Sequence, residues 1–246
     1  MVATDIPEPG SVDPALVQHL AAQVAALDPQ PRPRRWVSLS LCVLDAVWSI
    51  GLRYHQVVAP VVTKVASEFG VARPTVPAAT ALMEDPIPLT VFRDRFATAD
   101  ALRAVTTEHR TSTRGGIYKA DAAVRYADIL REHHIDTLAD ARHVLADPDR
   151  LAVVDADLRR VPGDGAHAIR RDYLWMLIGD DELIKPDRMV LRWLRHHGAD
   201  VGPATARRLV TAIAAVLNQD ESQPRQITAW EIDHALWQAG QKLPRL

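Results

Sequence analysis

Apolar side chains recur every three to four positions along most of this chain, which is the period of an α-helix. A clear early example begins at Asp13-Pro14, an acid and a proline that favour a helix start, and runs to about Leu27. Residues 38–52 are apolar almost all round, which is typical of a buried helix. No segment stands out with the alternation of a half-buried strand, so the sequence predicts an all-α fold.

Further helices follow, separated by connections rich in proline and glycine. We expect them at about residues 55–69, 89–96, 99–109, 118–133, 137–145, 166–178, 186–197, 203–217 and 228–240. The last begins with Thr228-Ala229-Trp230-Glu231, which has the residue types and spacing of a capping box. Prolines and arginines crowd residues 29–35. We therefore divide the chain into an N-terminal helix with a stiff linker (1–35) and a helical domain (36–246).

Composition and charge narrow the possible functions. Of the 246 residues, 48% are hydrophobic and 24% are charged, which are ordinary globular values. The formal net charge of −2 argues against a strong non-specific DNA binder, although a local basic face would suffice for binding. Arginines are dense at residues 159–195, where such a face is expected.

The single cysteine and the N-terminal sequence bear on cofactors and compartment. Cys42 lies in an apolar run, and one thiol excludes an intramolecular disulfide, a cysteine-rich zinc site and a four-cysteine iron–sulphur cluster. The N-terminus has no basic segment followed by an apolar core, and no apolar run is long enough to span a bilayer. We therefore expect a cytoplasmic protein.

Two glycines one residue apart lie in the stretch Val161-Pro162-Gly163-Asp164-Gly165-Ala166-His167, between two helical segments. Such a turn can leave its backbone amides free to face an anion such as a phosphate. A carboxylate follows at a helix start, in Lys185-Pro186-Asp187-Arg188. This combination suggests chemistry on a nucleic acid. However, a plain helix–helix turn also selects glycine, and the helix dipole favours an acid at any helix start.

The region from Leu158 to Arg195 resembles the core of the helix-hairpin-helix (HhH-GPD) DNA glycosylase superfamily. That superfamily carries a Leu-Pro-Gly-x-Gly hairpin, a helix, and then an acid entering another helix; here the pattern is Val161-Pro162-Gly163-Asp164-Gly165 with Asp187. Upstream, Gly116-Ile117-Tyr118-Lys119-Ala120 is similar to its Gly-hydrophobic-aromatic-x-Lys-Ala segment. The helix around residues 45–50 lies where its first core helix would lie. Order and approximate spacing agree over about residues 36–217.

Departures from this pattern change what the resemblance implies. His167 occupies the position of the lysine nucleophile in members with lyase activity, and histidine is a poor Schiff-base former. The implied enzyme is therefore monofunctional, and the lone Cys42 leaves it without an iron–sulphur cluster. Asp164 replaces a usually apolar hairpin residue and is expected to put negative charge beside the phosphate. A monovalent cation at the hairpin, held by backbone carbonyls, is the one cofactor that the resemblance allows.

The resemblance assigns a role to each candidate residue. Asp187 would be catalytic, because a carboxylate stabilises the positive charge that builds on the sugar as an N-glycosidic bond breaks. Residues expected to bind DNA are Gly163, Gly165, Ala166, His167, Arg170 and Arg188, with Arg171 as an alternative to Arg170. His167 would either contact a phosphate or cap the helix start. The aromatic candidates for stacking on a flipped base are Trp48, Tyr54 and Tyr118, although aromatic residues at helical spacing are more often core.

Taken together, the sequence predicts a two-lobed, all-α, HhH-GPD-like protein that acts as a monomer on double-stranded DNA. It would flip a damaged or modified nucleotide and hydrolyse its N-glycosidic bond without a lyase step. One alternative is a non-catalytic helix-hairpin-helix DNA-binding module, which Asp164 and the net charge of −2 favour slightly. Another is a helical domain that only packs or binds protein, in which Asp187 merely starts a helix.

Overall fold

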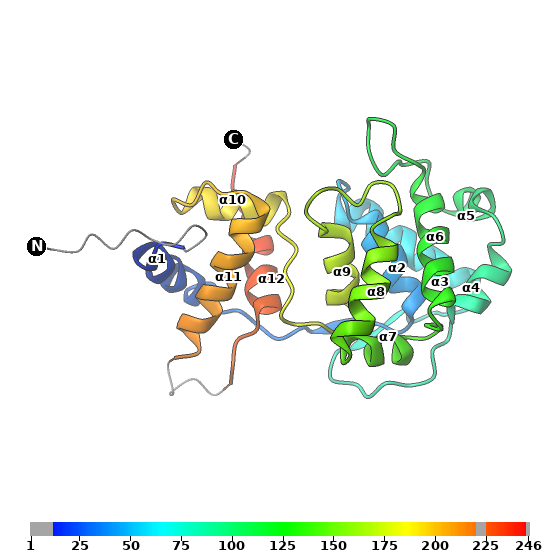
Figure 1. The fold of residues 1–246 in the computed structure, drawn as a ribbon, viewed down its shortest axis with the longest axis horizontal. Helices are drawn as coiled ribbons and strands as arrows, with labels where there is room; N and C mark the ends of the chain where they lie inside the picture. The colour runs from blue at the N-terminus through cyan, green and yellow to red at the C-terminus, as the bar shows by residue number, and fades with distance from the viewer. Residues whose placement is uncertain (1–11, 220–224, 245–246) are drawn as a thin grey trace, which may run out of the picture. The chain divides into compact units, whose positions relative to one another are not determined.

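The computed structural model describes residues 12–219 and 225–244, and in these ranges the regular structure is helical apart from one two-stranded sheet (Figure 1). The all-α fold class is thus confirmed. No helix in the described ranges is both long enough and apolar enough to cross a membrane. The chain divides into two compact units, Met1–Pro31 with Asp181–Leu246 and Arg32–Asp180, which we call the terminal unit and the central unit.

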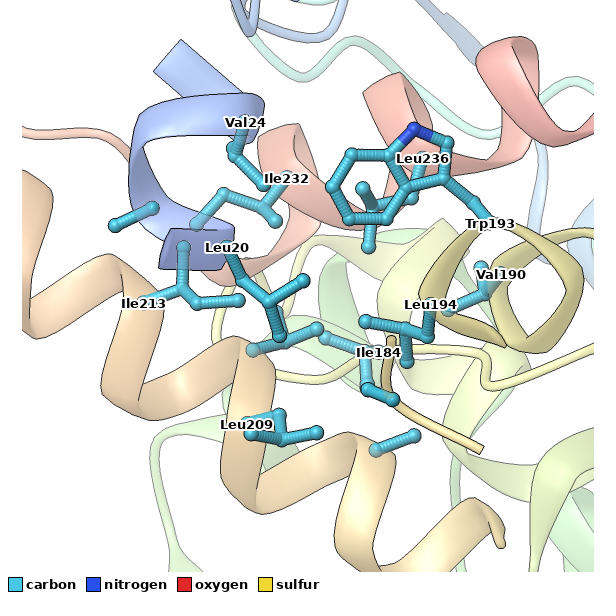
Figure 2. Packing of buried hydrophobic residues seen from close by; sticks show 14 of the residues in the cluster. Leu20, Val24, Ile184, Val190, Trp193, Leu194, Leu209, Ile213, Ile232 and Leu236 are labelled. Atoms are coloured by element: carbon cyan, nitrogen blue, oxygen red, sulfur yellow. The ribbon is translucent and has the colours of Figure 1, made fainter. Parts of the chain in front are cut away.

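The terminal unit joins the N-terminal helix to the last three helices of the chain. Its helices are α1 (Pro14–Ala25), α10 (Arg188–His196), α11 (Pro203–Leu217) and α12 (Ala229–Lys242). Helix α1 packs against α11, and α10 packs against α12. Figure 2 shows the shared core, in which side chains from all four helices meet, among them Leu20, Val24, Trp193, Leu194, Leu209, Ile213, Ile232 and Leu236. The N-terminal helix is held there because its apolar side would otherwise face water.

The central unit is built around one buried helix. Its helices are α2 (Leu39–Trp48), α3 (Ala59–Glu68), α4 (Leu89–Arg95), α5 (Ala99–Val105), α6 (Lys119–Glu132), α7 (Leu138–Leu145), α8 (Pro148–Leu158) and α9 (Ile169–Ile178), with a π-helical turn at Tyr54–Val58. Helix α2 packs against α3, α4, α6 and α9, and every one of its residues is buried. The prediction of a buried helix here is confirmed. Cys42 lies within it and is fully buried.

Two local elements differ from what the hydrophobic pattern predicted. The linker forms β1 (Arg34–Trp36), which pairs antiparallel with β2 (Thr75–Pro77). Three residues are too few to show an alternating pattern, and the pairing joins segments far apart in sequence. Helix α8 was not predicted, although Asp147-Pro148 at its start repeats the acid–proline pair that begins α1. The expected capping box of α12, between Thr228 and Glu231, is confirmed.

Asp85 fixes the starts of two helices at once. Its Oδ2 accepts the backbone N–H of Leu39, the first residue of α2, at 3.0 Å and that of Leu138, the first residue of α7, at 2.9 Å. Its Oδ1 accepts the N–H of Ile87 at 3.0 Å. Asp85 is 7% exposed, so water cannot readily replace these bonds. One carboxylate therefore satisfies three buried donors, two of which are helix-start N–H groups without an intrahelical partner.

We predict that Asp85→Ala lowers the free energy of unfolding by at least about 3 kcal/mol, because three buried N–H groups lose their acceptor at about 1–3 kcal/mol each. Asp147→Ala is the matched control, because Asp147 caps α8 through one exposed bond to the N–H of Arg150. Its cost should be about 1 kcal/mol. Urea denaturation of both variants measures the two costs, and equal losses would contradict this role of Asp85.

Candidate phosphate-binding hairpin and helix-start acid

The glycine-rich stretch forms an exposed turn between α8 and α9. Helix α9 begins at Ile169 rather than at Ala166, so residues 165–167 lie outside the helix and are exposed. Ala168, which precedes α9, has a left-handed backbone (φ 54°) and provides no side-chain cap. We call residues 165–167 the crest of the hairpin.

The two glycines are required for different reasons. Gly163 has a φ of +91°, and a Cβ placed on it would lie 2.3 Å from the Cβ of Thr111, so the hairpin backbone packs directly on the loop that contains Thr111. Gly165 has a φ of +73°, and a Cβ placed there would have nothing within 4 Å. Gly163 thus permits close packing, whereas Gly165 supplies a backbone conformation that side chains disfavour and leaves open space above it.

The amides of the crest are the part of the hairpin that can bind an anion. The backbone N–H groups of Gly165 and Ala166 donate to no acceptor within the described residues. They lie just before the N-terminus of α9, where the helix dipole favours negative charge. His167 is exposed beside them. The crest therefore has the donors that a phosphate requires.

Arg170 is a clamp inside the hairpin rather than a surface contact, which corrects its expected role. It is 1% exposed. Its Nη1 and Nη2 donate to the carbonyl oxygens of Pro162 (3.1 Å) and Val161 (2.7 Å), and its Nε donates to the hydroxyl of Tyr126 (2.8 Å). A buried guanidinium with these three bonds does not reach a phosphate in solution; it holds the start of the turn against α6.

Asp164 points into the central unit, so its charge does not lie at the crest as the sequence suggested. The residue is 8% exposed, and its Oδ2 accepts a hydrogen bond from Nε of Arg171 at 2.8 Å. Arg171 also pairs with Asp155 of α8. Burial raises the pKa of Asp164 to about 6, against the opposing effect of Arg170. The carboxylate is thus ionised at neutral pH and paired with Arg171 below the crest.

Other cations remain on the surface next to the hairpin. Arg159, which ends α8, is exposed. Arg114 is also exposed, in the loop at residues 111–116 that packs on Gly163 through Thr111. Arg159 belongs to the arginine-dense stretch at residues 159–195, where the sequence predicted a basic face, whereas Arg114 lies about fifty residues away and is brought to the hairpin only by the packing of its loop. Arg114 and Arg159 are therefore exposed near the hairpin, whereas Arg170 and Arg171 are buried.

The three aromatic candidates for a base pocket are engaged within the central unit. Trp48 is fully buried in α2, and its Nε1 donates to Oγ1 of Thr107 at 2.9 Å. The hydroxyl of Tyr54 donates to Oδ2 of Asp45 at 3.1 Å, and burial, followed by the charge of Asp45, raises the pKa of Tyr54. Trp48 is therefore a core residue, because a flipped base cannot stack on a ring that is covered by protein.

Tyr118 has its ring covered by cations. The guanidinium carbons of Arg103 and Arg110 lie 4.4 Å and 4.1 Å from the ring centroid. These contacts are cation–π interactions. Tyr118 precedes α6, so the two arginines fix the entry of the chain into that helix. A base that stacked on this ring would have to displace an arginine.

Asp187 lies in the terminal unit and caps α10. Its Oδ1 accepts the backbone N–H groups of Met189 (2.7 Å) and Val190 (3.3 Å). Its own N–H donates to the carbonyl of Lys185 at 2.6 Å, which closes a three-residue turn centred on Pro186. The other oxygen, Oδ2, accepts no hydrogen bond from the described residues. Arg188, the first residue of α10, is exposed.

Within the described ranges, no group of three or more histidine, cysteine or acidic side chains has an arrangement that could hold a metal ion. Of the histidine pairs in the sequence, His133 bonds to Asp157 through Nε2 at 2.8 Å. His197 packs against Trp193 with ring centroids 4.1 Å apart. His133 and His197 therefore have structural contacts at the ends of their helices.

Comparison with known proteins gives one family. The model of a family described as a domain of unknown function (DUF8548) matches residues 14–241, which is most of the chain. Neither the search among curated proteins nor the search among solved structures found a match.

We predict that Arg170→Lys destabilises the central unit by about 2–4 kcal/mol, because lysine cannot reproduce the fork that bonds two carbonyls and a hydroxyl. Arg159→Lys is the matched control on the exposed side of the same hairpin, with an expected change within about 0.5 kcal/mol. Chemical denaturation measures both. Similar costs for the two variants would show that Arg170 is not the clamp of the hairpin.

Proposed function

We propose that this chain, which belongs to the DUF8548 family, binds double-stranded DNA and removes a base from it. In this proposal the hairpin crest holds a backbone phosphate, and Asp187 assists hydrolysis of the N-glycosidic bond of a flipped, damaged or modified base. The observation that carries the proposal is the pair of exposed crest amides, of Gly165 and Ala166, that have no acceptor in the described chain.

The arrangement of charge around the hairpin supports phosphate binding. Buried N–H groups elsewhere, such as those at Asp85, have acceptors, whereas the crest amides are left open to solvent. The acid of the turn, Asp164, is paired with Arg171 below the surface, and the exposed side chains nearby include Arg114 and Arg159. Phosphate contacts of this kind position DNA without reading its sequence. The net charge of −2 then matters little, because binding depends on the local field.

The geometry of Asp187 supports a role as the acid. Two backbone N–H groups hold its Oδ1, so the carboxylate is oriented, while Oδ2 keeps its full capacity to stabilise an external charge. Loss of a base from a nucleotide passes through an oxocarbenium-like state, and an oriented carboxylate lowers its energy. The same carboxylate can orient the attacking water. His167, at the crest, is not a Schiff-base former, so the proposed reaction ends with base release.

A second function, DNA binding without catalysis, is favoured by one specific observation. The capping bonds of Asp187 give this residue a complete structural role at the start of α10. In that case the hairpin would bind DNA and the acid would only stabilise the helix. Separate tests of binding and of base release distinguish the two functions.

For binding, we predict that Ala166→Asp weakens the affinity for a duplex about tenfold, equivalent to about 1.4 kcal/mol, because a carboxylate at the crest repels the phosphate. The log–log slope of affinity against salt should also fall by about one. An acid before a helix start favours folding, so the protein should stay intact. Ala79→Asp, in the exposed loop after β2, is the matched control. Fluorescence anisotropy at several salt concentrations is the measurement; equal effects of the two substitutions would rule out the crest.

For catalysis, we predict that Asp187→Asn lowers base release by about 10²- to 10³-fold. Asparagine caps helices as well as aspartate does, so the substitution removes the charge and keeps the fold. The measurement is release of free base from duplexes with alkylated, deaminated, oxidised or hypermodified bases. Asp13→Asn, at the cap of α1 in the same unit, is the control and should retain full activity.

The outcome assigns the function. DNA binding that depends on the crest, together with no base release from any substrate, would establish the non-catalytic module. Base release that persists in Asp187→Asn would exclude Asp187 as the acid.

A further inference from the structure

The turn that carries Asp187 is attached to α12 on both sides. Before the turn, the backbone N–H of Trp230 donates to the carbonyl of Asp181 at 2.9 Å. Within it, the backbone N–H of Lys185 donates to Oδ1 of Asp233 at 2.9 Å. Asp233 lies in the first half of α12 and is 7% exposed. A buried side chain of α12 therefore fixes the segment two residues before Asp187.

The backbone after Asp187 also rests on α12. A Cβ placed on Gly240 would lie 2.2 Å from the carbonyl oxygen of Met189, so the two helix backbones are in direct contact there. Nη1 of Arg192 donates to the carbonyl of Gly240 at 3.2 Å. Met189 is one of the two residues whose N–H groups hold Oδ1 of Asp187. Helix α12 thus supports the turn from Lys185 to Met189 at each end.

We infer that Asp233 is the positioning residue of Asp187: by accepting the N–H of Lys185 it sets the turn that aims the Asp187 carboxylate. It does so without contacting DNA, because it is buried. The catalytic consequence of this inference rests on the proposed function, whereas the structural consequence does not.

The charge state of Asp233 matters because Asp187 lies within electrostatic range. Burial raises the pKa of Asp233 well above its ordinary value, and the charge of Asp187 raises it further. The hydrogen bond from the Lys185 backbone and the charge of the Lys185 side chain act in the opposite direction. Burial, the largest effect, thus favours the neutral carboxyl of Asp233, which still offers its carbonyl oxygen to Lys185. An ionised Asp233 would instead repel Asp187 and favour protonation of the acid.

Two substitutions separate these contributions. Asparagine keeps a neutral carbonyl acceptor in nearly the same shape, whereas alanine removes the acceptor from a buried N–H. We predict that Asp233→Ala lowers kcat for base release about tenfold or more and leaves duplex affinity within about twofold, because an acid displaced by a fraction of an ångström loses its alignment. Asp233→Asn should keep kcat within about threefold. We also expect kcat of the unsubstituted protein to fall at alkaline pH as Asp233 ionises, and this fall should be absent in Asp233→Asn.

The same pair of variants has a readout that needs no activity. Unfolded, Asp233 ionises near its ordinary pKa; folded, it stays protonated to higher pH, so the folded state binds more protons and its stability falls as pH rises between the two values. The asparagine side chain of Asp233→Asn does not titrate. We therefore expect the stability of Asp233→Asn, relative to the unsubstituted protein, to increase with pH above about 4. Amide hydrogen exchange at Met189 and Val190 should accelerate in Asp233→Ala and not in Asp233→Asn.

The outcomes separate this inference from the proposed function. Asp13→Ala, which removes the exposed side-chain cap of α1 in the same unit, is the control and should change neither kcat nor exchange at Met189. If Asp187→Asn abolishes base release while Asp233→Ala retains full kcat, the positioning role is wrong and the enzyme stands. If no base is released by any variant but Asp233→Ala alone loosens Met189 and Val190, the positioning role stands and the enzyme is wrong. Identical behaviour of the Asn and Ala variants overturns the inference.

Discussion

The fold depends on acceptors for the N–H groups that its many short helices leave unpaired. Each α-helix begins with donors that lack an intrahelical partner, and helices of seven to fifteen residues multiply such starts. Carboxylates and threonines supply most of the acceptors, as Asp85 does for two helices and Thr228 does for α12. Where the starts are buried, the acceptors are buried with them. In the described ranges four helices, α3, α6, α9 and α11, begin without a side-chain cap, and α9 is the one that follows the exposed glycine turn.

The same constraint explains how a hairpin with an acid in its middle can still present a basic face. Asp164 cannot cap α9 from the crest because it faces inward, where Arg171 neutralises it. Arg170 bonds the carbonyl oxygens on the entering side of the turn, so the backbone acceptors are covered inside. The exposed groups at and near the turn include the amide donors of Gly165 and Ala166 and the side chains of Arg114 and Arg159. In the proposed function, the local arrangement of donors at the turn, rather than the net charge of the chain, is what would favour an anion at the crest.

Elements with a local signal could be predicted from the sequence, and contacts between distant segments could not. The buried helix around Trp48 and the capping box at Thr228 follow from residues within a few positions of one another. The small sheet, by contrast, pairs residues about forty positions apart. Helix α8 does have a local signal, the pair Asp147-Pro148 at its start.

In the candidate site, too, the roles of residues with a local signal could be predicted, and the roles that depend on distant segments could not. The glycines were identified because a turn demands them locally. The inward direction of Arg170 depends on Tyr126 of α6, and that of Asp164 on Arg171, which is itself held by Asp155 of α8. Asp233 was missed for the same reason, since its partner Lys185 is forty-eight positions away. Side-chain direction is set by the neighbouring element, which a single sequence does not identify.

A capping role and a catalytic role for Asp187 are compatible, because they use different oxygens. Capping engages Oδ1 with two N–H groups, and this restricts the rotation of the carboxylate instead of consuming it. An unrestrained acid would lose the advantage of preorganisation, since it would have to be oriented during the reaction. The cap, the turn at Pro186 and the bond from Lys185 to Asp233 together hold the Asp187 carboxylate in one orientation. An acid that only stabilised its helix would need the capping bonds to Met189 and Val190. It would not need the buried carboxyl of Asp233 to hold the preceding turn.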